Sequence, residues 1–257
     1  MTTQSPVPPW GDDLLSNFLS DAEYNTRAAA ANFPTVFDLL REVHTTFVDI
    51  ESFVETDTRD QILVPRFLFI RAHASFLAAV RLSLAGQLPE SFAVQRVGIE
   101  QAWYALHIWR DPSGEGRVRT WLNRNDSVVT RDACKTVFTI RNVRASHEEL
   151  DPIGAAKLKS TYDRLIDFGG HPNPLGVLGA VMHSETESGA TFSVGILHAE
   201  TTPLLLATKV AIEGAIGVLM ILPLVYPERL KIMQIDRRID RLVDTLNEVF
   251  RPFIPKE

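Results

Sequence analysis

The residues with the clearest capacity for chemistry lie along one apolar helix that we expect at residues 89–109. Four polar side chains follow one another there at steps of four, four and three residues: Arg96, Glu100, Tyr104 and His107. This spacing places them on one face of a helix. An arginine and a carboxylate inside an apolar helix are costly unless they pair or meet a ligand. Two readings stay open: an Arg96–Glu100 ion pair capped by Tyr104 and His107, or a ligand pocket.

A second set of candidates lies in the loop Gly-Gly-His-Pro-Asn-Pro at residues 169–174. Glycines allow unusual backbone angles and prolines restrict them, so the loop can hold His171 and Asn173 in defined positions. Loops on a rigid scaffold often carry binding residues. We therefore consider a ligand pocket in which Arg96, Glu100 and His171 meet. The alternative is a simple connector, since turns favour these residue types.

Arg141 and His147 form a third candidate pair, with five residues between them. A histidine that takes a 2′-hydroxyl proton and an arginine that holds the phosphate are sufficient for RNA cleavage without a metal. Arg66 and His73 fit the same loose spacing.

The Arg141/His147 motif and the helical plan described below resemble HEPN-type all-helical proteins. Some of these are metal-independent ribonucleases, and several belong to toxin–antitoxin or phage-defence systems. The resemblance covers the fold class and this one motif. It implies that Arg141 and His147 are the catalytic pair and that they lie in an electropositive cleft, commonly at a dimer seam.

The segment from Arg117 to Arg144 and on to His147 is strongly basic. It holds seven arginines and lysines against Asp126 and Asp132, a local net charge of seven minus two, or +5. Such a surface suits RNA phosphates or an acidic partner, with Trp121 available for stacking. The alternative is a solvated face that binds nothing.

Several classes of function are excluded by what the sequence lacks. It has no GxxxxGK[ST], GxGxxG, GxSxG or HExxH motif, and no histidine has a glutamate three residues before it, as a di-iron bundle requires. The single cysteine, Cys134, excludes an internal disulfide and a cysteine-based zinc site. We expect no metal and no cofactor. The net charge of −6 does not favour a protein that coats nucleic acid or anionic lipid.

The elements that must position these residues are helices. Apolar periodicity, with glycine and proline at the boundaries, predicts helices at 12–33, 34–54, 64–85, 89–109, 118–123, 131–149, 152–168, 203–222 and 228–250. Two runs with β-branched residues flank a polar turn within 177–198, which predicts a β-hairpin. The helices at 64–85, 89–109 and 204–222 are apolar on nearly every side, so we expect them in the centre of a bundle.

The stretch at residues 204–226 is long enough to span a bilayer. Lys209 and Glu213 interrupt it, and charges near the middle of a span are costly, so we expect a buried core helix and no membrane partner. Residues 1–11 lack the pattern of a secretory signal and are expected to form a flexible lead-in. Cytoplasm is the expected location.

The sequence therefore predicts a mainly α fold: a multi-helix bundle with one small β-hairpin near residues 177–198, in a single domain over residues 1–257. The expected function is a non-catalytic binding or regulatory module, with a homodimer as one arrangement. The alternative is a HEPN-like metal-independent ribonuclease. The sequence leaves open whether the protein is an enzyme.

Overall fold

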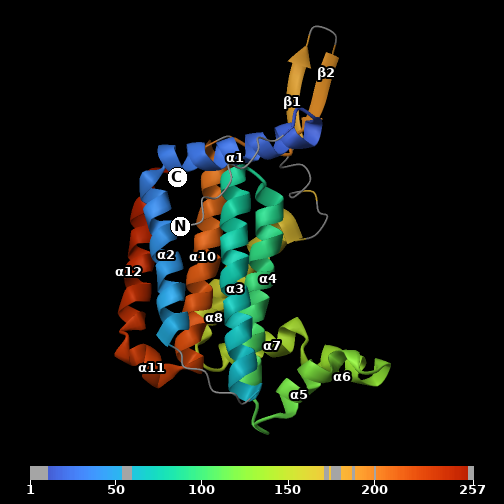
Figure 1. The fold of residues 1–257 in the computed structure, drawn as a ribbon, viewed down its shortest axis with the longest axis vertical. Coiled ribbons are helices and arrows are strands. Elements are labelled where there is room, and N and C mark those ends of the chain that lie inside the picture. Colours follow the sequence, from blue (N-terminus) through green and yellow to red (C-terminus); the bar gives the residue numbers. More distant parts are fainter. Residues whose placement is uncertain are drawn as a thin grey trace, which may run out of the picture.

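The centre of the molecule is three long helices that run side by side. A computed structural model describes residues 11–53, 60–170, 174, 181–186, 189–199 and 201–253. The central helices are α3 (Asp60–Ala85), α4 (Leu88–Trp109) and α10 (Thr201–Val225). Figure 1 shows them at the core of an elongated bundle. The mainly α bundle predicted from the sequence is confirmed.

The tight turn between α3 and α4 depends on Gly86. This residue ends α3 at a φ of +94°, a conformation that glycine adopts without steric cost. The amide of Gln87 donates to the Leu82 carbonyl at 2.9 Å and closes the last turn of α3. Pro89 then occupies the first turn of α4, where its missing N–H costs nothing. The two helices consequently form an antiparallel hairpin.

The helix α10 is the most enclosed of the three. Sixteen of its 25 residues are buried. The sequence suggested a break at Pro223, yet the helix continues through it to Val225. A proline so close to the end removes only one backbone hydrogen bond near the last turn.

Two helical stretches are long and apolar enough to cross a membrane, Leu63–Ala85 and Thr201–Val225. In the fold, 50% of the apolar 18-residue part of the first stretch is buried, and 78% of that of the second. The second value is what a core helix of a bundle requires.

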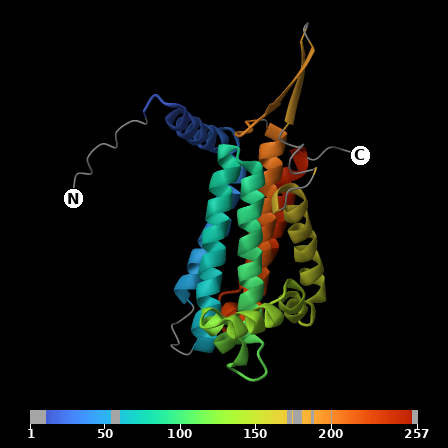
Figure 2. The same ribbon diagram turned by 90° about the vertical axis from the view of Figure 1, so that its right-hand side faces the viewer.

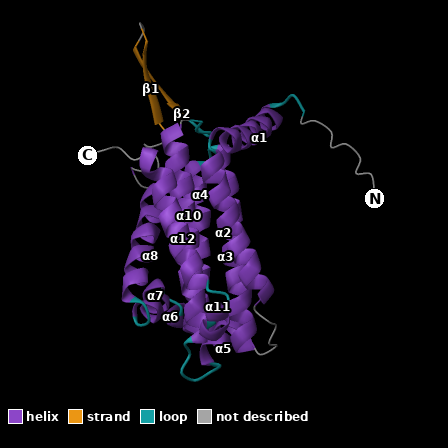
Figure 3. Cartoon of the chain, turned by 90° about the vertical axis from the view of Figure 1, so that its left-hand side faces the viewer, coloured by secondary structure: helices purple, strands orange, loops and turns teal. Residues whose placement is uncertain are grey.

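Outer helices cover this centre: α2 (Pro34–Phe53), α8 (Pro152–Leu165), the short α11 (Pro227–Ile232) and α12 (Ile235–Phe250). The helix α12 is strongly amphipathic and buries one stripe of residues at helical spacing: Ile235, Ile239, Leu242, Leu246 and Phe250. These side chains join one hydrophobic cluster with those of α3, α4 and α10. Figures 2 and 3 show α1 (Leu14–Asn32) lying across one end of the bundle.

At the other end, α5 (Gly116–Leu122) and α6 (Val128–Val137) project from the bundle, and α7 (Ile140–Glu148) leads back to it (Figure 1). The single helix expected at 131–149 is therefore two helices. Thr139 adopts extended backbone angles and its side chain accepts from the Asn142 amide, so it caps a new helix. Cys134 and Phe138 are buried where α6 meets the bundle.

The predicted β-hairpin is also present, as strands β1 (Val181–Thr186) and β2 (Gly189–Val194). They pair antiparallel, with Val181 opposite Val194 and Thr186 opposite Gly189. The hairpin extends beyond the same end of the bundle as α1 (Figure 1). After β2 the chain returns to the α3–α4 turn, where the amide of His198 donates to the Gly86 carbonyl at 2.9 Å. Before the hairpin, α8 ends in a π-helical turn at Ile166–Gly170.

Candidate functional site

An open cleft of about 1060 Å³ lies between the end of α4, α5 and α7. We call it the α4–α7 cleft. His107 and Ser146 lie among its buried lining residues, with 4% and 6% of their surfaces exposed. The walls carry charged and amide side chains: Arg110, Arg117, Asn142 and Glu149. Of the residues that the sequence singled out, the cleft brings together His107 and part of the basic segment.

His107 and Ser146 are hydrogen-bonded, with 2.9 Å between Nδ1 and Oγ. Burial, followed by the nearby Arg117 guanidinium, lowers the pKa of His107 to about 4, and the Val137 carbonyl and Asp111 only partly oppose this. The imidazole is therefore neutral at neutral pH. Its Nδ1 can accept the hydrogen of the Ser146 hydroxyl, while Nε2 makes no aligned hydrogen bond with a described residue.

Asp111 and Arg117 hold the turn that forms one wall of the cleft. The Asp111 carboxylate accepts from the Arg117 amide at 2.6 Å and from the Ser113 amide at 3.0 Å. Burial raises the pKa of Asp111, but these hydrogen bonds and the Ser113 hydroxyl outweigh that effect and lower the pKa. The Arg117 side chain donates from Nη1 to the His107 carbonyl at 2.7 Å. Asp111 is thus engaged with the backbone and does not pair with the His107 ring.

This arrangement is better suited to hydrogen bonding than to proton transfer. A catalytic histidine needs a pKa near the working pH, and in serine hydrolases a carboxylate stabilises the imidazolium. His107 has a pKa far below neutrality and a guanidinium nearby. A histidine with so low a pKa is a weak general base for the Ser146 hydroxyl.

The predicted Arg96–Glu100 ion pair is present, with 3.2 Å between Nε and Oε1. The expected caps are not. Tyr104 donates instead to the Phe138 carbonyl at 3.0 Å, and His107 bonds Ser146. The four side chains do not act as one group, because Arg96 and Glu100 face α8, whereas Tyr104 and His107 face Phe138 and α7.

The hydrogen bond to Glu100 comes from Tyr162 of α8, whose hydroxyl lies 2.7 Å from Oε1. Burial and this bond to a carboxylate raise the pKa of Tyr162. Sequence spacing gave no signal for this contact, because Tyr162 is 62 residues away along the chain.

The structure does not bring Arg141 and His147 together in an open cleft. Arg141 is exposed, whereas His147 is 1% exposed and its Nδ1 accepts from the Trp103 indole at 3.2 Å. Burial lowers the pKa of His147. Six residues along an α-helix place the two side chains about 120° apart around its axis. The HEPN-like reading stays a prediction, and the position of His147 argues against its use of this pair.

The other spacing match is also enclosed. His73 is 6% exposed, its Nδ1 lies 2.8 Å from Glu51, and its Nε2 lies 2.9 Å from Nδ1 of His44. Its ring stacks on Phe47 at 4.6 Å. His171 and Asn173 lie outside the described residues, so their meeting with Arg96 and Glu100 stays a prediction. In the part of the chain that the structure describes, no three side chains form a group that could hold a metal ion.

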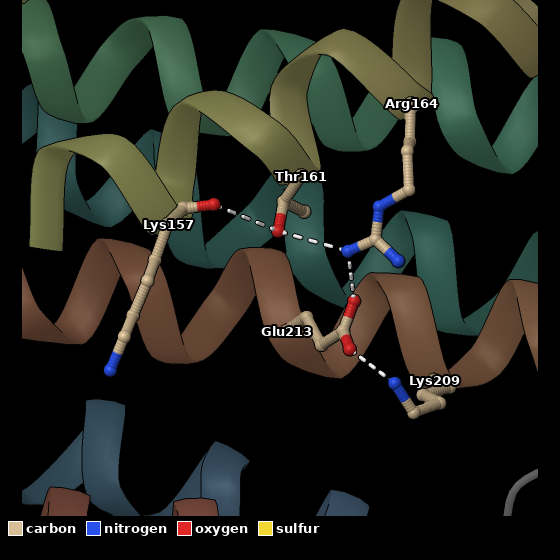
Figure 4. A network of polar contacts seen from close by, with 5 residues as sticks. All are labelled: Lys157, Thr161, Arg164, Lys209 and Glu213. Carbon is tan, nitrogen blue, oxygen red and sulfur yellow. Dashed lines mark hydrogen bonds and ion pairs between the residues drawn. The ribbon is translucent and has the colours of Figure 1, made fainter.

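The charges within α10 are matched by a charge on α8 (Figure 4). Glu213 pairs with Arg164 at 2.6 Å and also with Lys209 of its own helix. Arg164 donates in addition to Thr161 at 3.2 Å. This network fixes α8 against α10, while Tyr162 fixes the same helix against α4.

In comparisons with known proteins, no family model, curated protein or solved structure matches this chain. A function therefore has to be inferred from the geometry of the site.

Proposed function

We propose that the protein is a non-catalytic helical binding module that holds a small polar ligand in the α4–α7 cleft. The observation that supports this most directly is the buried His107–Ser146 pair, a neutral donor–acceptor unit in the lining of this cleft. Ligand sites commonly combine a concave surface with a few fixed polar groups.

The chemistry of the lining favours a ligand that accepts hydrogen bonds. Arg117 and the amide of Asn142 line the cleft together with the hydroxyls of Thr120 and Thr136. The acidic groups are already engaged: Asp111 accepts from backbone amides, and Glu149 lies 3.7 Å from Arg110 in an ion pair. With about 1060 Å³, the cleft is slightly larger than the range of about 300–1,000 Å³ typical of small-molecule sites.

The test is a screen of small carboxylates, phosphate esters, nucleosides and sugars by thermal shift on the purified chain. A compound at a hundred times its Kd should raise Tm by about 5–10 °C. Ser146→Ala and Arg117→Gln should abolish that shift. Ser83→Ala is the matched control. Ser83 is fully buried, and it lies near the end of α3 that is far from the cleft. Failure of every compound to bind, or binding that survives both cleft variants, would contradict the proposal.

The non-catalytic part of the proposal has its own test against the ribonuclease alternative. We expect that a fluorescent RNA incubated with the wild type shows no cleavage that depends on Arg141 or His147. RNA cleavage by the wild type that is lost in Arg141→Ala or His147→Gln, with folding unchanged, would show that the alternative is right.

A further inference from the structure

The helices α5 and α6, residues 116–137, form an arm that projects from the end of the bundle (Figure 1). Its surface exposes large apolar side chains that have no role in the bundle core. Val128 and Val129, in the first turn of α6, are 68% and 78% exposed, and Leu122 of α5 is 45% exposed. Apolar groups gathered on a projecting element mark an interaction surface.

The arm and the start of α7 also carry cations that form no ion pair with the described residues. Arg119 and Lys135 form ion pairs with Glu115 and Asp132. Three further arginines are exposed and make no ion pair with a described residue: Arg124, Arg131 and Arg141. The surface that the arm presents is therefore both apolar and positively charged.

A concavity at the same end of the bundle has the complementary composition. It measures about 360 Å³ and lies between the start of α8, the last turns of α10 and the first turns of α12. Its apolar lining includes Leu150, Met220, Leu224 and Ile239, and its charged residues are Asp151, Asp236 and Asp240. Among the described residues that line it, none is basic. We call it the acidic groove.

The carboxylates of the acidic groove are available to a partner. Asp236 and Asp240 are exposed and form no ion pair with a described residue. Asp151 uses one oxygen to cap α8 through the Gly154 amide. A partner with apolar side chains next to arginines would match both the lining and the charge of this groove.

We propose that the arm of one copy of this chain docks in the acidic groove of a second copy. Val128 and Val129 contact the apolar lining, and Arg124 and Arg131 lie against the aspartates. If each copy supplies one arm and one groove, the exchange closes a two-fold dimer. We favour a protein over RNA as the partner of the arm, because a phosphate backbone provides no apolar contact for Val128 and Val129.

The experiment measures the mass of the full chain by light scattering and sedimentation over a range of concentrations. The wild type should approach twice 28.7 kDa. Arg124→Glu with Arg131→Glu reverses the charge of the arm, and Asp236→Arg with Asp240→Arg reverses that of the groove. Each double variant should weaken dimerisation at least about tenfold, because like charges then face each other across the contact. The quadruple variant, in which both signs are exchanged, should recover most of the lost affinity. Arg81→Glu, an exposed charge reversal on α3, is the control.

Several outcomes would overturn the proposal. One is a wild type that stays monomeric at every concentration. Another is a dimer that both double variants leave intact, and a third is a quadruple variant that dimerises no better than the doubles while its circular dichroism matches the wild type. Binding of a single-stranded RNA probe by a monomeric wild type, lost in the arm variant, would instead assign the arm to nucleic acid.

Discussion

At the scale of single residues, His107 carries the main argument for binding over catalysis. Its neutral state depends on burial and on Arg117, so it can be tested by titration. The pKa of His107 is about 4 in the folded chain, against an ordinary value of 6.5. Between these values the unfolded chain binds more protons than the folded one. The free energy of unfolding therefore falls as the pH drops through this window.

We expect this residue to cost the wild type about 2 kcal/mol of stability between pH 7 and pH 5. The buried His147, whose pKa is also lowered, adds a loss of the same sign. Urea unfolding at the two pH values measures the loss, which should be smaller in His107→Gln. Ser83→Ala, a change at a buried residue that removes no titrating group, is the control. An unchanged pH dependence in His107→Gln would show that the imidazole is not held neutral by the fold.

The sequence anticipated part of the site at this scale. Helical spacing was enough to identify the Arg96–Glu100 pair and to draw attention to His107. It could not identify Ser146 or Tyr162 as partners, because both come from helices that meet α4 only through the tertiary fold. Charge and spacing also suggested His147, whose burial depends on packing against Trp103.

At the scale of elements, α8 is held from two sides. Tyr162 bonds Glu100 of α4, and Arg164 pairs with Glu213 of α10. We expect Tyr162→Phe to lower the free energy of unfolding by about 1–2 kcal/mol, because the lost bond is to a carboxylate. Tyr104→Phe, which loses a bond to a neutral carbonyl, should cost about 1 kcal/mol or less. Denaturant unfolding of the two variants makes the comparison, and an equal or smaller cost for Tyr162→Phe would contradict it.

Element boundaries show what local signals can and cannot determine. Gly86 and Pro89 marked the α3–α4 turn because their backbone preferences are local. The boundary between α6 and α7 was missed, although Thr139 is a good capping residue, since the surrounding sequence keeps a helical pattern. Pro223 was read as a break, yet its place near the end of α10 makes it tolerable.

At the scale of the whole molecule, the burial of α10 bears on whether the protein needs a membrane. Most of its apolar surface already packs against other helices. We expect the chain to remain in the supernatant after high-speed centrifugation of a lysate and to be purified without detergent. Recovery only from the membrane pellet, with release by detergent, would show that the two apolar stretches serve as spans.

The fold class and the central helices could be predicted because apolar content sets which helices are enclosed. The arrangement of the outer helices could not, because it depends on contacts between residues far apart in the sequence. The α4–α7 cleft is an example: α4 and α7 are both recognisable in the sequence, but nothing local indicates that His107 and Ser146 face each other.

Cys134 is placed where its chemical reactivity can report local opening of the structure around α6. The only thiol in the sequence is 3% exposed and lies where α6 joins the bundle. A reagent reaches a buried thiol only when the structure around it opens. If α6 detaches from the bundle more readily than the whole chain unfolds, the rate of modification under native conditions measures the free energy of that local opening. Docking of the arm in a partner would slow the modification of Cys134 in proportion to the fraction of docked arms. The extent of dimerisation could then be followed by the rate of this reaction, without a label on the protein.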